Sequence, residues 1–276
     1  MPNSRNVESP ISLVGLGRSG TTVLQAAFGR HPAVQVCGET FGIISSLWAG
    51  SMTSFLENDF LHQAQSPLKQ DEKAAHYIRA CMCALCPGER PHWFHKPIGM
   101  PKFLNWKWLP GDKSPITNFP TDWYWQVLDE CFPRSTYITT VRSPWDVLLS
   151  RQEFSGWSLQ GMALDVEFTY ELYERAGDRI QEVVFFDDLV DQPEDVLRRL
   201  CKTCDLDFRR EMMQAFDRSH AAVKGRGPKR DHRERWSELK GLKFRESSLR
   251  RMSDFWKAHG RELEIPEGLR VIAEKV

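Results

Sequence analysis

Short apolar runs alternate with longer amphipathic segments along most of this chain. The runs are rich in Val, Ile, Phe and Thr, which favour strands. Strands are therefore predicted at residues 11–14, 34–37, 136–141 and 182–186. Apolar residues at helical spacing predict helices at residues 21–30, 121–131, 144–153, 165–177, 193–204 and 247–260, with further helix between 40 and 88. This alternation favours an α/β fold, a three-layer sandwich whose helices cover both faces of a central parallel sheet.

Two segments show neither the apolar runs expected of strands nor the apolar spacing expected of helices. Residues 89–118 are interpreted as irregular and aromatic-rich, and residues 219–240 as a basic loop region.

A glycine-rich turn follows the first predicted strand. The stretch Gly15-Leu-Gly-Arg-Ser-Gly-Thr-Thr22 leads into a helix, and such a turn surrounds an anion with backbone N–H groups at the positive end of the helix dipole. It matches the dinucleotide-binding pattern G-x-G-x-x-G, and also a P-loop in which Thr21 replaces the lysine. The nearest cation is Arg18, inside the turn. Glu39 stands where a dinucleotide site needs an acidic residue, so spacing alone leaves both interpretations open.

A second phosphate site is predicted after the strand at 136–141. Arg142 follows that strand directly, Pro144 suits a first helical position, and Ser150 lies further along the same helix. An arginine gives paired donors to phosphate oxygens, and a serine hydroxyl adds one more. Ligands of parallel sheets bind at the carboxyl ends of the strands, so both phosphate motifs are expected at one edge of the sheet.

The two motifs together resemble the sulfotransferase family, whose donor is 3′-phosphoadenosine 5′-phosphosulfate (PAPS). Arg18-Ser-Gly-Thr-Thr22 resembles the 5′-phosphosulfate loop, and Arg142 with Ser150 resembles the clamp for the 3′-phosphate. The stretch 182–208 resembles a later strand and helix of the family, and we interpret it as a strand and a helix of the core without a catalytic role. The resemblance implies one domain over residues 1–276 with a P-loop NTPase-like sulfotransferase fold. The donor would be held by Arg18, Ser19, Gly20, Thr21, Thr22, Arg142 and Ser150.

The resemblance also implies catalytic residues. Glu39 follows the second predicted strand, where the branch that includes protein-tyrosine and several bacterial sulfotransferases carries its base. Arg18 and Lys113 are the cations expected at the transferring group, because Lys113 begins a sequence that resembles the family's K-x-P element. Lys96, also followed by proline, is the competing candidate and ranks lower on its distance from Arg142. No metal is implied, since arginine and lysine supply the positive charge.

A late basic segment is a further nucleotide-contact candidate. The family has a Gly- and Arg-rich loop that reaches the nucleotide, and the stretch Lys224–Arg230 occupies the corresponding place with a different pattern. Its candidate residues are Arg226, Lys229 and Arg230. A solvated basic loop is the alternative.

The sequence does not identify the acceptor of the sulfuryl group. The resemblance implies a hydroxyl on a small molecule, a glycan or a tyrosine. Tryptophans crowd the region between Glu39 and Arg142, where they either line an acceptor pocket or pack in the core: Trp93, Trp106, Trp108, Trp123 and Trp125.

Composition narrows the class of protein. The 276 residues include 37 basic and 37 acidic side chains, which argues against a general nucleic-acid coat protein. No apolar signal core opens the chain and no run reaches the length of a membrane span, so a cytoplasmic enzyme is expected. The cytosol would keep all seven cysteines reduced. Only Cys81, Cys83 and Cys86 cluster, either as plain thiols or as a zinc site completed by His92 or His95.

Three other functions remain as alternatives at this stage. A P-loop kinase would need magnesium and ATP, and Thr21 in place of lysine counts against it. A dinucleotide-dependent oxidoreductase would leave Arg142 and Ser150 without a role. A non-catalytic nucleotide-binding protein would keep the anion cradle without Glu39 and Lys113 acting. The oligomeric state, a homodimer included, is left open.

Overall fold

The computed structural model describes residues 8–45, 47, 70–85, 90–98, 121–155, 158–216 and 232–273. At its centre is a five-stranded parallel sheet in the order β2-β3-β1-β4-β5. The strands are β1 (Ile11–Gly15), β2 (Val34–Glu39), β3 (His92–Lys96), β4 (Thr136–Val141) and β5 (Ile180–Phe185). The chain passes from β1 to the edge strand β2, returns to β3 between them, and then crosses to β4 and β5 on the other side of β1. The adjacent strands β1 and β4 therefore flank a topological switch point, where such sheets bind ligands.

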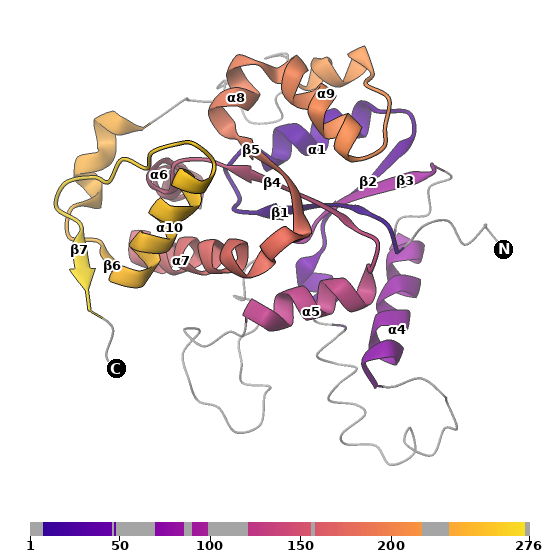
Figure 1. The fold of residues 1–276 in the computed structure, drawn as a ribbon, viewed down its shortest axis with the longest axis horizontal. Helices are drawn as coiled ribbons and strands as arrows, with labels where there is room; N and C mark the ends of the chain where they lie inside the picture. Colours follow the sequence, from indigo (N-terminus) through magenta and orange to yellow (C-terminus); the bar gives the residue numbers. More distant parts are fainter. Residues whose placement is uncertain are drawn as a thin grey trace.

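Two apolar cores lie on opposite faces of this sheet. Leu13 joins one core and Val14 joins the other, as the two-residue period of a strand requires. The first face is covered by α1 (Thr21–Arg30), α8 (Phe186–Asp191), α9 (Pro193–Thr203) and the 3₁₀ helix η4 (Arg210–Phe216). The second is covered by α4 (Gln70–Leu85), α5 (Thr121–Cys131) and α7 (Leu159–Ala176). Figure 1 shows the three layers, which confirm the predicted α/β sandwich.

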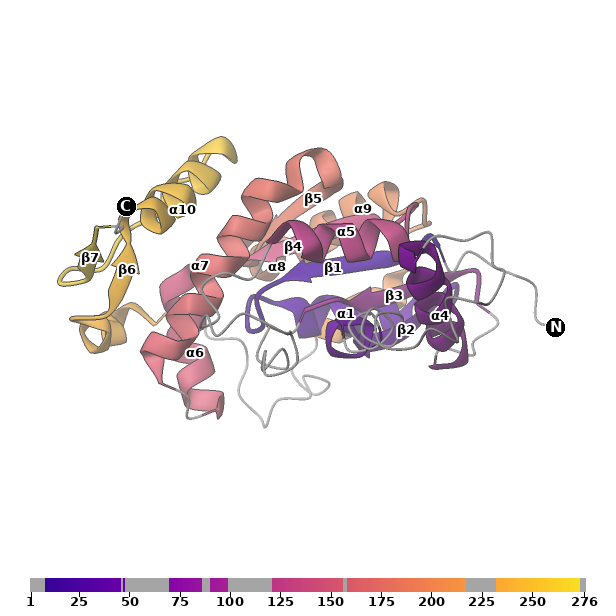
Figure 2. The same cartoon turned by 90° about the horizontal axis from the view of Figure 1, so that it is seen from below.

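A third core extends the molecule beyond one end of the sheet. There α6 (Pro144–Ser155) and α10 (Glu246–Ala258) pack on α7, beside a two-stranded ribbon of β6 (Lys243–Arg245) and β7 (Arg270–Ile272). Figure 2 shows this group standing apart from the sheet. The short helices η3 (Gly177–Arg179) and η5 (Arg233–Leu239) complete the described elements.

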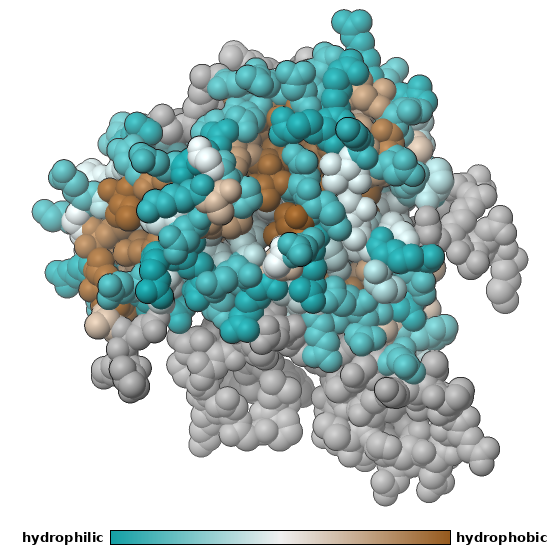
Figure 3. All heavy atoms as spheres, in the orientation of Figure 1, coloured by the Kyte–Doolittle hydropathy of each residue, from teal (hydrophilic) through white to brown (hydrophobic). Residues whose placement is uncertain are grey.

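The surface is mostly polar on the side seen in Figure 3, with apolar atoms gathered around the β6–β7 ribbon. Ile265, Val271 and Ile272 are the exposed apolar side chains of that region. Within the described part of the chain, no helix has the length and hydropathy needed to span a membrane.

The four predicted strands are present with some boundaries shifted, but three further strands were not predicted: β3 and the two short strands of the ribbon, β6 and β7. β3 lies between β2 and β1, in a segment that was expected to be irregular. Its residues, His-Trp-Phe-His-Lys, show no apolar alternation, although Trp93 to Lys96 are all buried. A strand buried on both faces loses the period-2 signal, which explains the miss. Helix α7 begins earlier than predicted because Ser158 caps it by accepting a hydrogen bond from the Gly161 N–H.

Candidate active site

The carboxyl ends of four neighbouring strands bring the predicted site residues to one edge of the sheet. In strand order this edge carries Glu39 at the end of β2, Lys96 at the end of β3, the glycine-rich turn after β1, and Arg142 after β4. Neighbouring strands lie about 4.8 Å apart, so these groups form a row about 15 Å long. The row places an acidic group and a lysine at one end and the two phosphate motifs at the other.

The glycine-rich turn has a backbone that side chains rarely adopt. Gly15, Arg18 and Gly20 have φ angles of 133°, 73° and 101°. A Cβ on Gly15 would lie 2.7 Å from the Tyr173 hydroxyl, and one on Gly20 would lie 3.0 Å from Phe186 and Leu189 carbons. Arg18 is a non-glycine residue in the left-handed region, a strained conformation typical of functional turns. The turn therefore depends on glycine at both ends for conformation and for space.

Buried hydroxyls hold the turn from below. Ser19 Oγ donates to the Leu16 carbonyl at 2.6 Å, so it must accept the 2.8 Å hydrogen bond from Thr140 Oγ1. Thr139 Oγ1 contacts the Val14 carbonyl at 2.8 Å and the Tyr173 hydroxyl at 3.1 Å. Burial raises the pKa of Tyr173 to about 12, so it remains a neutral donor. The Ser19 side chain thus shapes the turn from inside, while helix α1 begins at Thr21 with its N-terminus facing the turn.

The two phosphate motifs are joined by direct contacts. Arg18 Nε donates to Ser150 Oγ at 3.3 Å, and Arg142 Nη1 donates to the Arg18 carbonyl at 3.3 Å. The guanidinium carbon of Arg142 lies 4.5 Å from the centre of the Phe186 ring, and that of Arg18 lies 4.9 Å from the centre of the exposed Phe154 ring. Burial lowers the pKa of Arg18 from 12.5, while the Glu153 carboxylate raises it. Two cations therefore converge on one place, held by residues far apart in sequence.

Asp146 ties a later segment to the same helix. Its Oδ1 accepts a hydrogen bond from the His232 N–H at 3.0 Å and one from Trp236 Nε1 at 3.1 Å. Asp146 lies one turn before Ser150 on α6, and it is almost fully buried. The described structure therefore resumes at His232 beside the second phosphate motif, inside the segment 219–240 that was predicted to be a basic loop. Part of that segment, Arg233–Leu239, is instead the 3₁₀ helix η5. Arg226, Lys229 and Arg230 themselves lie outside the described residues.

At the other end of the row, Glu39 and Lys96 form an ion pair. Lys96 Nζ lies 3.2 Å from Glu39 Oε1, and their side chains are 5% and 63% exposed. The lysine stem is buried under the sheet edge while the carboxylate faces solvent. β2 extends to Glu39 instead of ending at Cys37 as predicted, so Glu39 is the last residue of the strand. Lys113, which the sequence analysis ranked above Lys96, lies outside the described residues.

A sequence model described as the sulfotransferase family matches residues 10–210, almost three quarters of the chain. This chain belongs to the sulfotransferase family. Its fold is similar to that of a sulfotransferase domain from the curacin biosynthetic pathway, with a TM-score of 0.50 at 16% identity, covering 93% of this chain and 99% of that one. A sulfotransferase domain from an olefin synthase of Synechococcus PCC 7002 gives a TM-score of 0.47 at 16% identity, covering 78% and 80%. Among curated proteins no match to the chain was found.

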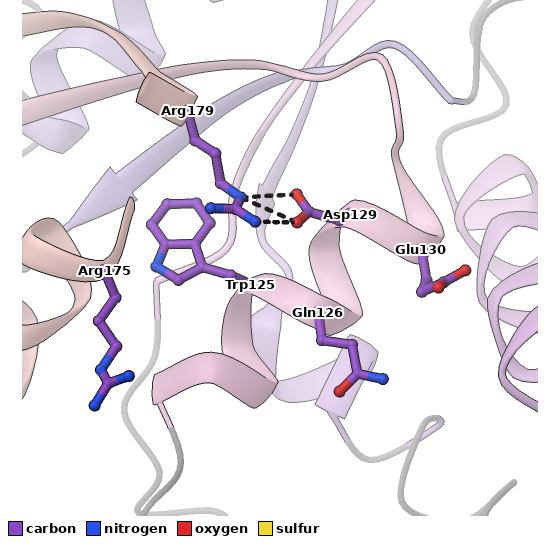
Figure 4. A pocket seen from close by; sticks show the side chains of 6 residues that line it. All are labelled: Trp125, Gln126, Asp129, Glu130, Arg175 and Arg179. Carbon is purple, nitrogen blue, oxygen red and sulfur yellow. Dashed lines mark hydrogen bonds and ion pairs between the residues drawn. The ribbon is translucent and has the colours of Figure 1, made fainter. Parts of the chain in front are cut away.

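A pocket of about 340 Å³ in this sulfotransferase lies away from the phosphate motifs. Figure 4 shows the residues that line it, which come from α5, the end of α7 and η3: Trp125, Gln126, Asp129, Glu130, Arg175 and Arg179. Arg179 donates two hydrogen bonds to Asp129 Oδ2, from Nη2 at 2.8 Å and from Nε at 3.0 Å. These segments lead into β4 and β5, so the pocket lies at the amino ends of the strands. Trp125, one of the tryptophans considered for an acceptor pocket, lines it, but the pocket contains none of the predicted catalytic or donor-binding residues. Both phosphate motifs lie at the opposite edge of the sheet.

Several sequence candidates have a structural role in the described part of the chain. Trp93 and Trp125 are buried in a core, and Trp125 Nε1 donates to the Leu172 carbonyl at 3.0 Å. The expectation that every cysteine is reduced is wrong at Cys37, which is disulfide-bonded. No group of three or more potential metal ligands stands together among the described residues, and Cys86 lies outside them. His95, one of the two histidines considered as a zinc ligand, is fully buried, and this burial lowers its pKa to about 3.

The structure also adds residues that sequence reasoning did not find. Tyr173 and Thr139 support the turn, and Asp146 anchors the segment at His232. Each lies far in sequence from the group it holds, and none belongs to a short motif. The sequence carried no pattern that predicted β3. The place of Lys96 therefore became known only from the strand order of the sheet.

Proposed function

We propose that this chain transfers the sulfuryl group of PAPS to a hydroxyl group of a small molecule, a glycan or a tyrosine. The observation that carries this proposal is the order of groups along the sheet edge. A carboxylate and a lysine stand at one end, and two phosphate motifs joined by the Arg18–Ser150 and Arg142–Arg18 hydrogen bonds stand at the other. An acceptor and a bisphosphorylated donor need this separation, because one end must remove a proton while the other holds the nucleotide.

The described residues fit a donor with two phosphate groups. The turn has positive φ angles at Gly15, Arg18 and Gly20, and such left-handed backbone lets successive N–H groups surround an anion. We propose that Arg18, Ser19, Gly20, Thr21 and Thr22 hold the 5′-phosphosulfate, the serine through its backbone. Arg142 and Ser150 would hold the 3′-phosphate, since Ser150 accepts from Arg18 and keeps its own proton to donate. Arg226, Lys229 and Arg230 stay as proposed contacts from the segment that ends at His232.

Glu39 is the proposed general base. Bound PAPS supplies the sulfuryl group: the acceptor oxygen bonds to sulfur, the bond from sulfur to the phosphate oxygen breaks, and the acceptor proton goes to Glu39. The exposed Glu39 carboxylate is accessible to an acceptor, whereas His95 is fully buried with both ring nitrogens in hydrogen bonds. This contrast supports a glutamate base over a histidine base at this edge.

Positive charge beside the transferring group is the third requirement. Arg18 meets it from the turn. For the lysine we retain Lys113, which the family resemblance indicates, and we add Lys96 on its place between Glu39 and the turn. No resident metal is part of this proposal. A cytoplasmic location and a single domain over residues 1–276 stay predictions.

Calorimetric titration tests the donor site. The ligand is 3′-phosphoadenosine 5′-phosphate, the stable donor product, compared with ATP and NAD, each with and without magnesium. We expect tight binding of the bisphosphate without magnesium, and its loss in Arg142→Ala. Arg209→Ala, at an exposed arginine that directly precedes η4 and pairs with Asp207, is the matched control and should bind normally. Preference for ATP with magnesium, or equal binding by the two variants, would contradict the proposed donor.

A further inference from the structure

A chain of buried side-chain hydrogen bonds runs beneath the Glu39–Lys96 pair. Thr40 Oγ1 lies 2.7 Å from His95 Nδ1, and His95 Nε2 lies 2.6 Å from Ser12 Oγ. Ser12 Oγ lies 2.6 Å from Ser135 Oγ, which reaches the Pro10 carbonyl at 3.0 Å. All four side chains are buried. The chain thus links the end of β2 to β3, β1 and the start of β4.

Counting protons fixes the direction of these hydrogen bonds. The Ser135 hydroxyl donates its one proton to the Pro10 carbonyl, so it must accept the hydrogen bond from the Ser12 hydroxyl. Ser12 must then accept from His95 Nε2, which places the proton of the neutral ring on that nitrogen. His95 Nδ1 is left as an acceptor, and Thr40 donates to it. Neutrality of the ring follows from its burial, which lowers the pKa of His95 to about 3.

The backbone pairing between β2 and β3 is interrupted just before Glu39. The register shifts between Val36 and Glu39, and Gly38 adopts a φ of 76° inside the shift. Such a bulge turns a side chain in a new direction and weakens the ladder locally. Two hydrogen bonds join the chain to β3 again directly after the bulge. The Thr40 N–H donates to the Lys96 carbonyl at 3.0 Å, and the Thr40 hydroxyl donates to His95 Nδ1.

We propose that the Thr40–His95 hydrogen bond positions the reactive pair, with Thr40 fixing Glu39 and His95 fixing Lys96. Each partner of this bond is the chain neighbour of one member of the pair. The ring of His95 packs against the rings of Trp93 and Phe132, with ring centres 4.6 Å and 5.2 Å away, so its position is restricted by packing as well as by hydrogen bonds. Thr40 and His95 are therefore positioning residues, which do not touch either substrate. The catalytic part of this inference rests on the proposed function.

Thr40→Val is the direct test because it keeps the shape of the side chain and removes the donor. We expect kcat for sulfotransfer to fall about 10- to 100-fold from misplacement of the pair, with the affinity for 3′-phosphoadenosine 5′-phosphate unchanged. Thr40→Ser keeps the hydroxyl and should restore most of kcat. Thr169→Val is the matched control, since Thr169 is equally buried and bonds only within α7. A normal kcat in Thr40→Val, or no rescue by serine, would overturn the positioning role.

Hydrogen exchange gives a readout that does not depend on catalysis. In Thr40→Val the amide of residue 40 should exchange roughly five- to tenfold faster, as expected when one neighbouring hydrogen bond is lost. Thr40→Ser and Thr169→Val should exchange there like the parent chain. If the parent chain sulfates no acceptor, the proposed function fails while this exchange result still decides whether the bond holds β2. Unchanged exchange in Thr40→Val would contradict the proposal in either case.

A second pair of variants covers the possibility that Thr40→Val does not fold. In His95→Asn the amide oxygen can occupy the place of Nδ1 and still accept from Thr40, whereas His95→Gln moves its amide toward the place of Nε2. Both lose the ring packing equally. The proposal predicts faster exchange at residue 40 and lower kcat for His95→Gln than for His95→Asn. Equal values for the two would overturn it.

Discussion

The two ends of the site edge are built differently. At the donor end, Arg18, Ser150 and Arg142 lock together by direct hydrogen bonds between the turn, α6 and the end of β4. At the acceptor end, Glu39 is mostly exposed and its ion pair with Lys96 stands above neutral buried hydroxyls and an imidazole. The proposed donor end is thus organised by the residues that we propose bind the nucleotide, and the proposed acceptor end by buried residues beneath the ion pair. The proposed reaction requires a fixed donor and an accessible acceptor, which agrees with this difference.

Glu39→Gln should produce the largest effect, and it acts on the acceptor end alone. Removing the base is expected to lower kcat about 10²- to 10⁴-fold, while titration with 3′-phosphoadenosine 5′-phosphate gives the parent affinity. Glu211→Gln, at an exposed position on η4, is the control. If Glu39→Gln instead weakens nucleotide binding and spares kcat, the two ends do not divide the work as described.

Lys96→Met should follow in size. Methionine fills the buried volume of the stem without its charge, and the partner Glu39 stays solvated, so the fold is expected to survive. Loss of one charge at the transferring group is expected to lower kcat about 10²-fold. Lys113→Met is the comparison. A larger loss in Lys113→Met would return the role to the lysine that the family resemblance indicates.

The fold and the meeting of the two phosphate motifs at one edge of the sheet could be predicted from the sequence because their signals are local. The turn from Gly15 to Thr22 and the Arg142–Ser150 spacing are short patterns next to apolar strands, and the structure brings them into contact. The acceptor end could not be predicted to the same depth. Lys96 was ranked second on its distance from Arg142. The strand that positions it was not predicted, because β3 is buried on both faces and shows no alternation. His95 looked like a possible metal ligand, and only tertiary packing shows that both its nitrogens are occupied.

Gly15→Ala tests how firmly the donor end is built. The new Cβ would lie 2.7 Å from the Tyr173 hydroxyl and 2.9 Å from Thr139 Oγ1, at a φ of 133°. We expect a loss of about 1–3 kcal/mol in the free energy of unfolding, measured in urea. Gly29→Ala in α1 meets only the Val36 side chain at 3.5 Å and should be neutral or slightly stabilising. Equal stability of the two variants would show that the turn is not tightly packed.

Asp187→Asn should give the smallest effect, and its sign depends on pH. Burial raises the pKa of Asp187 above 3.8, while Arg261 and Arg142 lower it. A carboxyl with a raised folded pKa binds protons more readily when folded, so the folded state loses stability as pH rises through that range. Asp187→Asn should therefore be slightly more stable at pH 7, by no more than about 0.5 kcal/mol for so exposed a group. This gain should vanish below pH 3.8, and a gain that persists there would exclude the carboxyl as its cause.

Transfer of labelled sulfate from PAPS to a panel of phenols, sugars and tyrosine peptides, without magnesium, tests the central claim most directly. The parent chain and Glu39→Gln are compared at equal occupancy of the donor site. The account predicts a sulfated product from the parent chain and a large loss of rate in Glu39→Gln. Tight nucleotide binding with no product from either chain would leave a nucleotide-binding protein and contradict the enzyme. Equal rates from both chains would contradict the assignment of the base.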